Sequence, residues 1–112
     1  MECVTRRGDI VTIALQGDFG KPRPALVVQS DLYNLTHPTI TVLPLTSDLR
    51  NATHFRITVE PSATNGLRNI SQIMVDKPMT YLADKLGTHA GRLDEETMLR
   101  VNRALAVWMG LA

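Results

Sequence analysis

The chain has 112 residues, of which 44% are hydrophobic and 21% are charged, and this suits one ordinary globular domain spanning residues 1–112. Lys and Arg number 12 and Asp and Glu number 11, so the net charge is only +1 and does not indicate a strongly basic nucleic-acid binder. A local basic groove is still compatible with this total, because a groove depends on where the charges lie.

Cysteine use and hydropathy indicate the compartment. Cys3 is the single cysteine, which rules out an intramolecular disulfide and fits a reducing cytoplasm. No apolar run approaches the ~20 residues that a membrane span needs, and residues 1–7 lack the apolar segment of a secretory signal. We therefore expect a cytoplasmic protein with no membrane partner.

Short strand patterns separated by turn residues fill the first two-thirds of the chain. Residues 10–15 alternate in character, and residues 24–28 are almost wholly apolar, as in a strand buried on both faces. Residues 30–34 indicate a turn or a single helical turn. Further strands are predicted at residues 39–43, which are rich in β-branched side chains, at the alternating residues 55–59, and at residues 70–75.

The last third of the chain changes to a helical period. Asp94 can cap a helix, and the two glutamates that follow would sit where negative charge suits the helix dipole. Gly110 ends the pattern, and we expect Trp108 to pack in the core. The apolar stripe consists of Met98, Val101, Leu105 and Trp108. These patterns predict a mainly β fold, a small barrel or strongly bent sheet, with a C-terminal helix packed on it.

Metal and cofactor signatures are missing from the sequence. His37, His54 and His89 lie far apart, without paired Cys/His or HExxH spacing. The sequence also lacks a GxSxG elbow, a P-loop and a GxGxxG loop. We therefore expect no metal site and no cofactor.

Two short segments could hold a phosphate. Arg23 stands between Pro22 and Pro24 at the mouth of a buried strand, where a stiffened backbone would fix a guanidinium that can bond two phosphate oxygens. Thr46 and Ser47 follow a later strand, and their hydroxyls could either form a local turn or donate to a phosphate oxygen. Taken separately, Arg23 is more simply read as an exposed arginine after a turn.

In combination, these segments resemble the MazF/PemK toxin family. The resemblance rests on residues 8–11, on Lys-Pro-Arg-Pro-Ala-Leu-Val-Val-Gln-Ser at 21–30, on residues 42–47, on Asn-Gly-Leu at 65–67 and on Val-Asp-Lys-Pro-Met-Thr at 75–80. It extends from near residue 6 to the C-terminus. It implies a small SH3-like or CcdB-like β-barrel with a C-terminal helix, built as a two-fold homodimer.

The resemblance also implies an activity and a partner. Members of this family are endoribonuclease toxins of type II toxin–antitoxin systems, which cut single-stranded RNA at short sequence motifs and are silenced by a cognate antitoxin. We expect the antitoxin to use an acidic, disordered C-terminal segment that folds on binding.

The family's catalytic positions fall on Arg23, Thr46 and Asp76. The catalytic arginine of the Kid/PemK branch falls on Met74, so either Arg23 does more of the work or another base supplies the charge. Asp76 is either a general base or a group that orients Arg23. Further RNA contacts are expected from Phe19, Lys21, Ser47, Arg50 and Lys77.

The chemistry expected of such a site follows from the substrate. RNA carries its own nucleophile, the 2′-hydroxyl, so the enzyme needs to move protons and to stabilise a charged phosphorane. The products would be a 2′,3′-cyclic phosphate and a 5′-hydroxyl, formed without a metal ion.

A non-enzymatic alternative belongs to the same fold group. CcdB-like gyrase poisons bind through the end of the terminal helix, which carries a Trp-Gly-Ile ending. Residues 108–112, Trp-Met-Gly-Leu-Ala, echo that ending loosely, although those proteins lack the Arg-Pro-Ala-Leu-Val-Val segment. A third interpretation is an inactive member that only binds its antitoxin.

Overall fold

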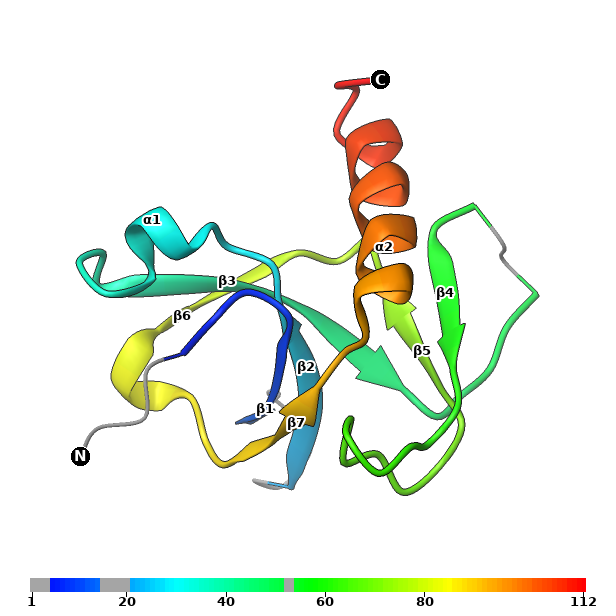
Figure 1. Cartoon of the computed structure of the whole chain (residues 1–112), viewed down its shortest axis with the longest axis horizontal. Helices are drawn as coiled ribbons and strands as arrows, with labels where there is room; N and C mark the ends of the chain where they lie inside the picture. The colour runs from blue at the N-terminus through cyan, green and yellow to red at the C-terminus, as the bar shows by residue number, and fades with distance from the viewer. Residues whose placement is uncertain (1–4, 15–20, 52–53) are drawn as a thin grey trace.

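The computed structural model of the chain describes residues 5–14, 21–51 and 54–112. Within these ranges the chain forms a curled antiparallel sheet with one long helix standing against it (Figure 1). The strands are β1 (Asp9–Ala14), β2 (Pro22–Val27), β3 (Thr39–Thr46), β4 (Arg56–Val59), β5 (Ser71–Met74), β6 (Met79–Leu82) and β7 (His89–Arg92). The helices are α1 (Asp31–Asn34), the 3₁₀ turn η1 (Ala83–Lys85) and α2 (Glu95–Trp108). The predicted mainly β fold with a C-terminal helix is confirmed.

The long strand β3 organises the sheet. The strand order is β4-β5-β3-β2-β1-β7, and β6 also pairs with β3. One edge of β3 pairs with β2, while the other edge pairs with β6 near Thr39 and with β5 near Thr46. The two ends of β3 therefore belong to two differently directed parts of the sheet, and the sheet curls around it (Figure 1).

The central strands are buried on both faces, as the apolar run at 24–28 predicts. One cluster contains Leu26 and Leu43 and is covered by Val101 of α2. The other contains Ala25 and Val27 and lies on the opposite face, where Met79 and Tyr81 of β6 pack against it. Alternation along β2 sends neighbouring side chains to opposite clusters.

The terminal helix begins and ends as predicted. The Asp94 side chain accepts a hydrogen bond from the backbone N–H of Thr97 (2.9 Å), and Gly110 adopts a φ of +76° after the last turn. Trp108, expected in the core, is instead 48% exposed, because the last turns of α2 project beyond the sheet (Figure 1). Its ring contacts Phe55, with centroids 5.7 Å apart.

Some elements escaped the sequence patterns. Strand β6 is half-buried to exposed, and β7 is a short His-Ala-Gly-Arg segment, so neither shows a clear apolar alternation. The single helical turn expected at 30–34 is confirmed as α1, with the Ser30 hydroxyl accepting from Leu32 N (3.2 Å). None of the helices in the described part of the chain is long and apolar enough to cross a membrane.

Candidate active site

The strand register brings Arg23 and Thr46 together. In the β2–β3 ladder Ala25 lies opposite Pro44, so continuing the register by two residues places Arg23 opposite Thr46. Directly opposed residues of an antiparallel pair have side chains on the same face, close enough to interact. The arginine and the hydroxyl that the sequence singled out separately are therefore cross-strand neighbours.

The same row continues across the sheet. Thr46 lies opposite Gln72 on β5, and Gln72 lies opposite Thr58 on β4. Arg23, Thr46, Gln72 and Thr58 form what we call the polar row. The Gln72 amide donates to the Thr58 hydroxyl (3.3 Å), which confirms that these two side chains share a face. The row lies on the side of β4 and β5 away from the main core, which is filled from these strands by residues such as Ile57 and Ile73.

Gln72 also fixes the loop that follows β3. It is buried, its carbonyl oxygen accepts from the backbone N–H of Arg50 (2.8 Å), and its amide donates to the carbonyl of Arg50 (2.8 Å). The Thr46 hydroxyl accepts from the backbone N–H of Asp48 (3.1 Å) and tightens the turn at the end of β3. Both interactions give the backbone around Thr46 a defined geometry.

A second arginine stands beside the polar row. Arg56 on β4 lies directly opposite Met74 on β5, and both side chains are half-buried. Arg56 is two residues from Thr58, so it projects from the same face as the polar row. The sequence patterns did not single out Arg56, because β-strand alternation indicates a face but not which strands are neighbours.

Asp76 lies in the turn between β5 and β6, two residues beyond Met74. Its Oδ1 atom is buried and has no hydrogen-bond partner within the described part of the chain. A buried carboxylate oxygen without a donor costs about 1–3 kcal/mol, so this atom is an acceptor whose donor is not among the described residues.

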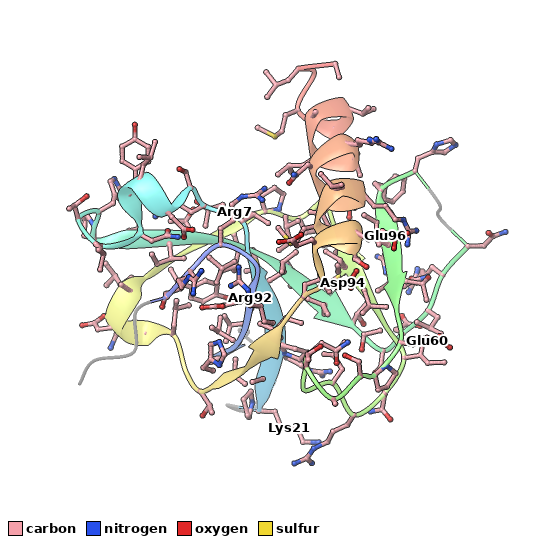
Figure 2. All side chains as sticks on the ribbon, viewed as in Figure 1. Arg7, Lys21, Glu60, Arg92, Asp94 and Glu96 are labelled. Atoms are coloured by element: carbon pink, nitrogen blue, oxygen red, sulfur yellow. The ribbon has the colours of Figure 1, made fainter. Side chains whose placement is uncertain are left out.

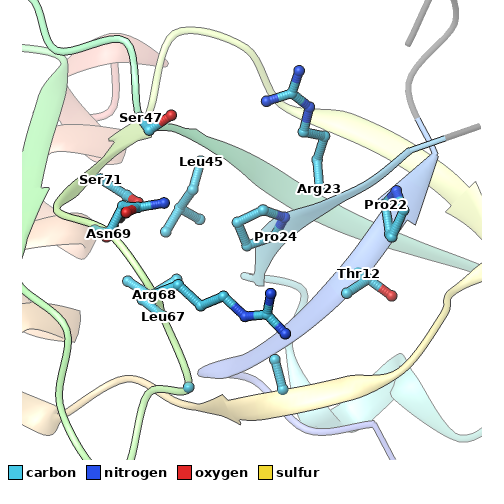
Figure 3. A pocket seen from close by; sticks show the side chains of 12 residues that line it. Thr12, Pro22, Arg23, Pro24, Leu45, Ser47, Leu67, Arg68, Asn69 and Ser71 are labelled. Carbon is cyan, nitrogen blue, oxygen red and sulfur yellow. Dashed lines mark hydrogen bonds between the residues drawn. The ribbon is translucent and has the colours of Figure 1, made fainter. Parts of the chain in front are cut away.

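A cavity of about 440 Å³ lies on the opposite face of β2 and β3 from the polar row, at the same end of these strands. Arg23 and Ser47 both line it, and Figure 3 shows the Arg23 side chain leaving β2 on the side away from Pro24 and Arg68. Among the described residues, twelve line the cavity, and none of these is acidic. Its polar lining consists of Thr12, Arg23, Ser47, Arg68, Asn69 and Ser71.

The remaining predicted RNA contacts are dispersed. Lys21 is exposed just before β2 (Figure 2), Lys77 is exposed in the turn of Asp76, and exposed Arg50 pairs with Asp48 at 3.0 Å. These side chains, like Asp76, are not among the described residues that line the cavity. Phe19 and the rest of the loop at 15–20 lie outside the described residues.

Metal ligands do not cluster in the described ranges. Among residues 5–14, 21–51 and 54–112, no three His, Cys, Asp or Glu side chains are grouped in a way that could hold a metal ion. Asp9 of β1 instead pairs with two basic residues of β7: its Oδ1 atom lies 2.8 Å from Arg92 and 3.4 Å from His89.

The described residues thus form a small curled sheet with one terminal helix, in which an arginine and a threonine stand at neighbouring strand ends. Residues 6–109 match the family described as "PemK-like, MazF-like toxin of type II toxin-antitoxin system". The chain belongs to this family, and the predicted resemblance is confirmed.

Individual relatives agree with this assignment. The chain is 43% identical over 108 residues to the "Probable endoribonuclease MazF" of Mycolicibacterium smegmatis (strain ATCC 700084 / mc(2)155), covering 96% of this chain and 98% of that protein. Among solved structures, it is similar to an endoribonuclease in complex with its cognate antitoxin from a mycobacterial species (TM-score 0.82, 25% identity, 96% and 97% coverage). It shares its fold with a MazE–MazF structure from Deinococcus radiodurans (TM-score 0.78, 20% identity, 99% and 100% coverage).

Proposed function

We propose that this chain is a sequence-specific endoribonuclease that cleaves single-stranded RNA and acts as the toxin of a type II toxin–antitoxin pair in the cytoplasm. The observation that carries the proposal is the β2–β3 register, which, continued by two residues beyond Ala25 and Pro44, brings Arg23 opposite Thr46 in a member of the PemK-like, MazF-like family. A fixed guanidinium beside a hydroxyl suits a phosphate that gains negative charge during reaction.

The proposed reaction uses the nucleophile within the RNA. The 2′-oxygen loses its proton and forms a bond to phosphorus, the bond from phosphorus to the 5′-oxygen breaks, and the 5′-oxygen takes up a proton. Arg23 stabilises the phosphorane, and fixed donors of this kind contribute about 10²–10³-fold to the rate. Thr46 orients the phosphate. The products are a 2′,3′-cyclic phosphate and a 5′-hydroxyl.

Asp76 and Arg56 complete the proposed site. The buried Oδ1 of Asp76 provides an acceptor, which suits removal of a proton or orientation of a guanidinium. Arg56 supplies positive charge in the region of Met74, because the two residues are directly opposed on β4 and β5. This places a second cation on the face of the polar row without an arginine at position 74.

We further propose a homodimer that an acidic antitoxin segment inhibits by covering Arg23 and the polar row. An acidic peptide carries negative charges like those of a phosphate backbone. Because exposed charges at the edge of the site attract it, its affinity should fall as the salt concentration rises. A competition experiment tests this idea: the antitoxin's C-terminal segment should displace a labelled uncleavable RNA. Simultaneous binding of peptide and RNA without mutual weakening would show that inhibition acts elsewhere.

A gyrase-poison function is the second candidate, and the exposed end of α2 is the observation that favours it. Trp108, Met109 and Leu111 are all exposed there, as in a surface that binds a protein partner. Incubating the purified protein with a long natural mRNA in EDTA separates the two functions. The nuclease proposal expects discrete cleavage products, whereas intact RNA together with inhibition of gyrase would favour the alternative.

A further inference from the structure

The cavity near the polar row is lined by an arginine side chain, Arg68, that is not part of that row. Arg68 belongs to the connection between β4 and β5, and Figure 3 shows its side chain running along the cavity beside Pro24 and toward Thr12. The cavity is bounded on its other sides by residues of β1, β2 and the end of β3. Arg68 is therefore presented to the same space as Ser47, but from a different element.

The loop that carries Arg68 is held by a buried asparagine. Asn65 is only 4% exposed, and its side-chain oxygen accepts from the backbone N–H groups of Ser62 and Leu67, each at 3.0 Å. Its amide donates to the carbonyl of Glu60 (2.9 Å). The Asn65 side chain thus links the start of the loop to Leu67, the residue before Arg68. These bonds fix the backbone that carries the Arg68 guanidinium.

Close backbone packing fixes this loop against β7. A Cβ at Gly66, whose φ is +70°, would collide with the carbonyl of Ala90, and a Cβ at Gly91 would collide with the backbone of Asn65. The backbone N–H of Arg92 donates to the carbonyl of Thr64 (2.7 Å). The two chain segments touch without intervening side chains, so this wall of the cavity is pre-formed.

The charge in the cavity favours an anion. Among the described residues, the lining includes the Arg68 side chain and no acid, while the Arg23 side chain points away from Pro24 and Arg68. Arg68 forms no hydrogen bond or ion pair with another described residue. Ser47 and Asn69 add a hydroxyl and an amide to the lining. Arg68, Ser47 and Asn69 are all exposed, so each can be reached by a phosphate, and a guanidinium can bond two of its oxygens.

We propose that this cavity binds the nucleotide next to the scissile phosphate, with Arg68 contacting the phosphate of that nucleotide. The inference rests on the proposed nuclease function. Ser47, which lines the cavity, directly follows Thr46 of the polar row, so an RNA strand that passes the end of β3 can contact both. A volume of about 440 Å³ lies within the range of sites for small ligands, about 300–1,000 Å³.

The first test measures binding. A fluorescent single-stranded RNA methylated at its 2′-oxygens, and so resistant to cleavage, is titrated with wild type, Arg68→Ala and Arg68→Lys over a series of salt concentrations. Arg68→Ala should weaken binding about tenfold and reduce the slope of log affinity against log salt by about one, because one phosphate contact is lost. Arg68→Lys should keep the slope while losing part of the affinity.

A matched control shows that the effect comes from the cavity. Arg103 is an exposed arginine on α2 that is outside the described cavity lining, so Arg103→Ala removes the same charge elsewhere. Its affinity and salt slope should stay within about twofold of wild type. Equal losses in Arg68→Ala and Arg103→Ala would overturn the site and indicate general electrostatics.

The second test measures cleavage against substrate length. Once the cleavage motif is known from the 5′ ends of cut mRNA, a minimal substrate is extended by one nucleotide on either side. The value of kcat/KM for wild type should rise with one of the extensions, and Arg68→Ala should lose most of that rise. If Arg68→Ala gains as much as wild type from both extensions, the assigned contact is wrong.

The two proposals fail in different ways. RNA that wild type neither binds nor cleaves would contradict the nuclease function and the cavity assignment together. Cleavage by wild type, combined with an Arg68→Ala protein that matches it in affinity, salt slope and extension gain, would overturn only the cavity assignment. Arg68 is exposed, so Arg68→Ala should melt at the same temperature as wild type.

Discussion

Arg23 and Thr46 have different tasks in the proposed site, and their substitution should show it. Arg23→Ala should lower the cleavage rate by about 10²–10³-fold, because it removes the charge that stabilises the phosphorane. The melting temperature, measured on the same samples, reports whether the fold survives. Activity within about threefold of wild type would contradict the role of Arg23.

Thr46→Val should be the milder change. A hydroxyl orients the phosphate but carries no net charge, so we expect a loss of roughly tenfold in single-turnover rate. Because the Thr46 hydroxyl also accepts from the backbone N–H of Asp48, the matched variant Thr46→Ser retains this acceptor and should retain most activity. A larger loss in Thr46→Val than in Arg23→Ala would reverse the hierarchy.

Individual residues differ in how far the sequence could predict them. Arg23 and Thr46 can be proposed from the sequence because each stands at the end of a recognisable strand, and the continued β2–β3 register brings them opposite each other. Arg56 and Arg68, which we propose from the structure, could not be proposed from the sequence, because their neighbours are set by the pairing of β4 with β5 and by the packing of a loop on β7. Such long-range contacts leave no local periodicity in the sequence.

At the scale of elements, helix α2 depends on its cap. The hydroxyl of Thr97, and then its backbone N–H, hold the pKa of the Asp94 carboxyl below its ordinary value of 3.8. Asp94→Ala should therefore lower the free energy of unfolding by about 1 kcal/mol near neutral pH. Urea unfolding of both proteins measures the difference.

The pH dependence of that difference has a defined sign. A carboxyl whose pKa is lowered by folding stabilises the native state above its unfolded pKa, and this stability is lost as the pH falls through the folded pKa. The gap between wild type and Asp94→Ala should thus be full above pH 3.8 and shrink below it. Asp84→Ala, which removes an exposed acid of η1, is the control. A gap that persisted unchanged in acid would show that the cap acts without its charge.

Strand β4 provides a test of register. Arg56→Ala should lower the cleavage rate about tenfold or more, because it removes a cation from the face of the polar row. Adding Met74→Arg should restore part of the rate, since residues 56 and 74 are directly opposed. Single-turnover kinetics with Arg103→Ala as control measure both effects. Arg56→Ala with wild-type kinetics would remove Arg56 from the proposed site.

The elements themselves were predictable where burial imposes a pattern. Strands β1 to β5 and helix α2 bury one or both faces, and their apolar residues recur at the matching period. Strands β6 and β7 are short and mostly exposed, so their pairing with β3 and β1 is decided by tertiary contacts. Trp108 has the spacing of the apolar helical stripe, but it is exposed because the end of α2 extends beyond the sheet.

At the scale of the molecule, a net charge of +1 is compatible with an RNA-binding face because the total does not say where the charges lie. Among the described residues, the lining of the cavity that contains Arg68 has no acid, whereas Glu95 and Glu96 lie in the first turn of α2, where Figure 2 labels Glu96. Total charge therefore could not indicate this site from the sequence, and its location depends on how the sheet curls around β3.

The central claim is that RNA supplies its own nucleophile to a site built around Arg23 and Thr46. The most direct test uses a substrate carrying the mapped cleavage motif, in EDTA, with a single 2′-deoxynucleotide at the cleaved position. We predict that the all-RNA substrate is cut to a 2′,3′-cyclic phosphate and a 5′-hydroxyl, while the substituted substrate stays intact because its 2′-oxygen is missing. Cleavage of the substituted substrate at the same position would contradict this mechanism.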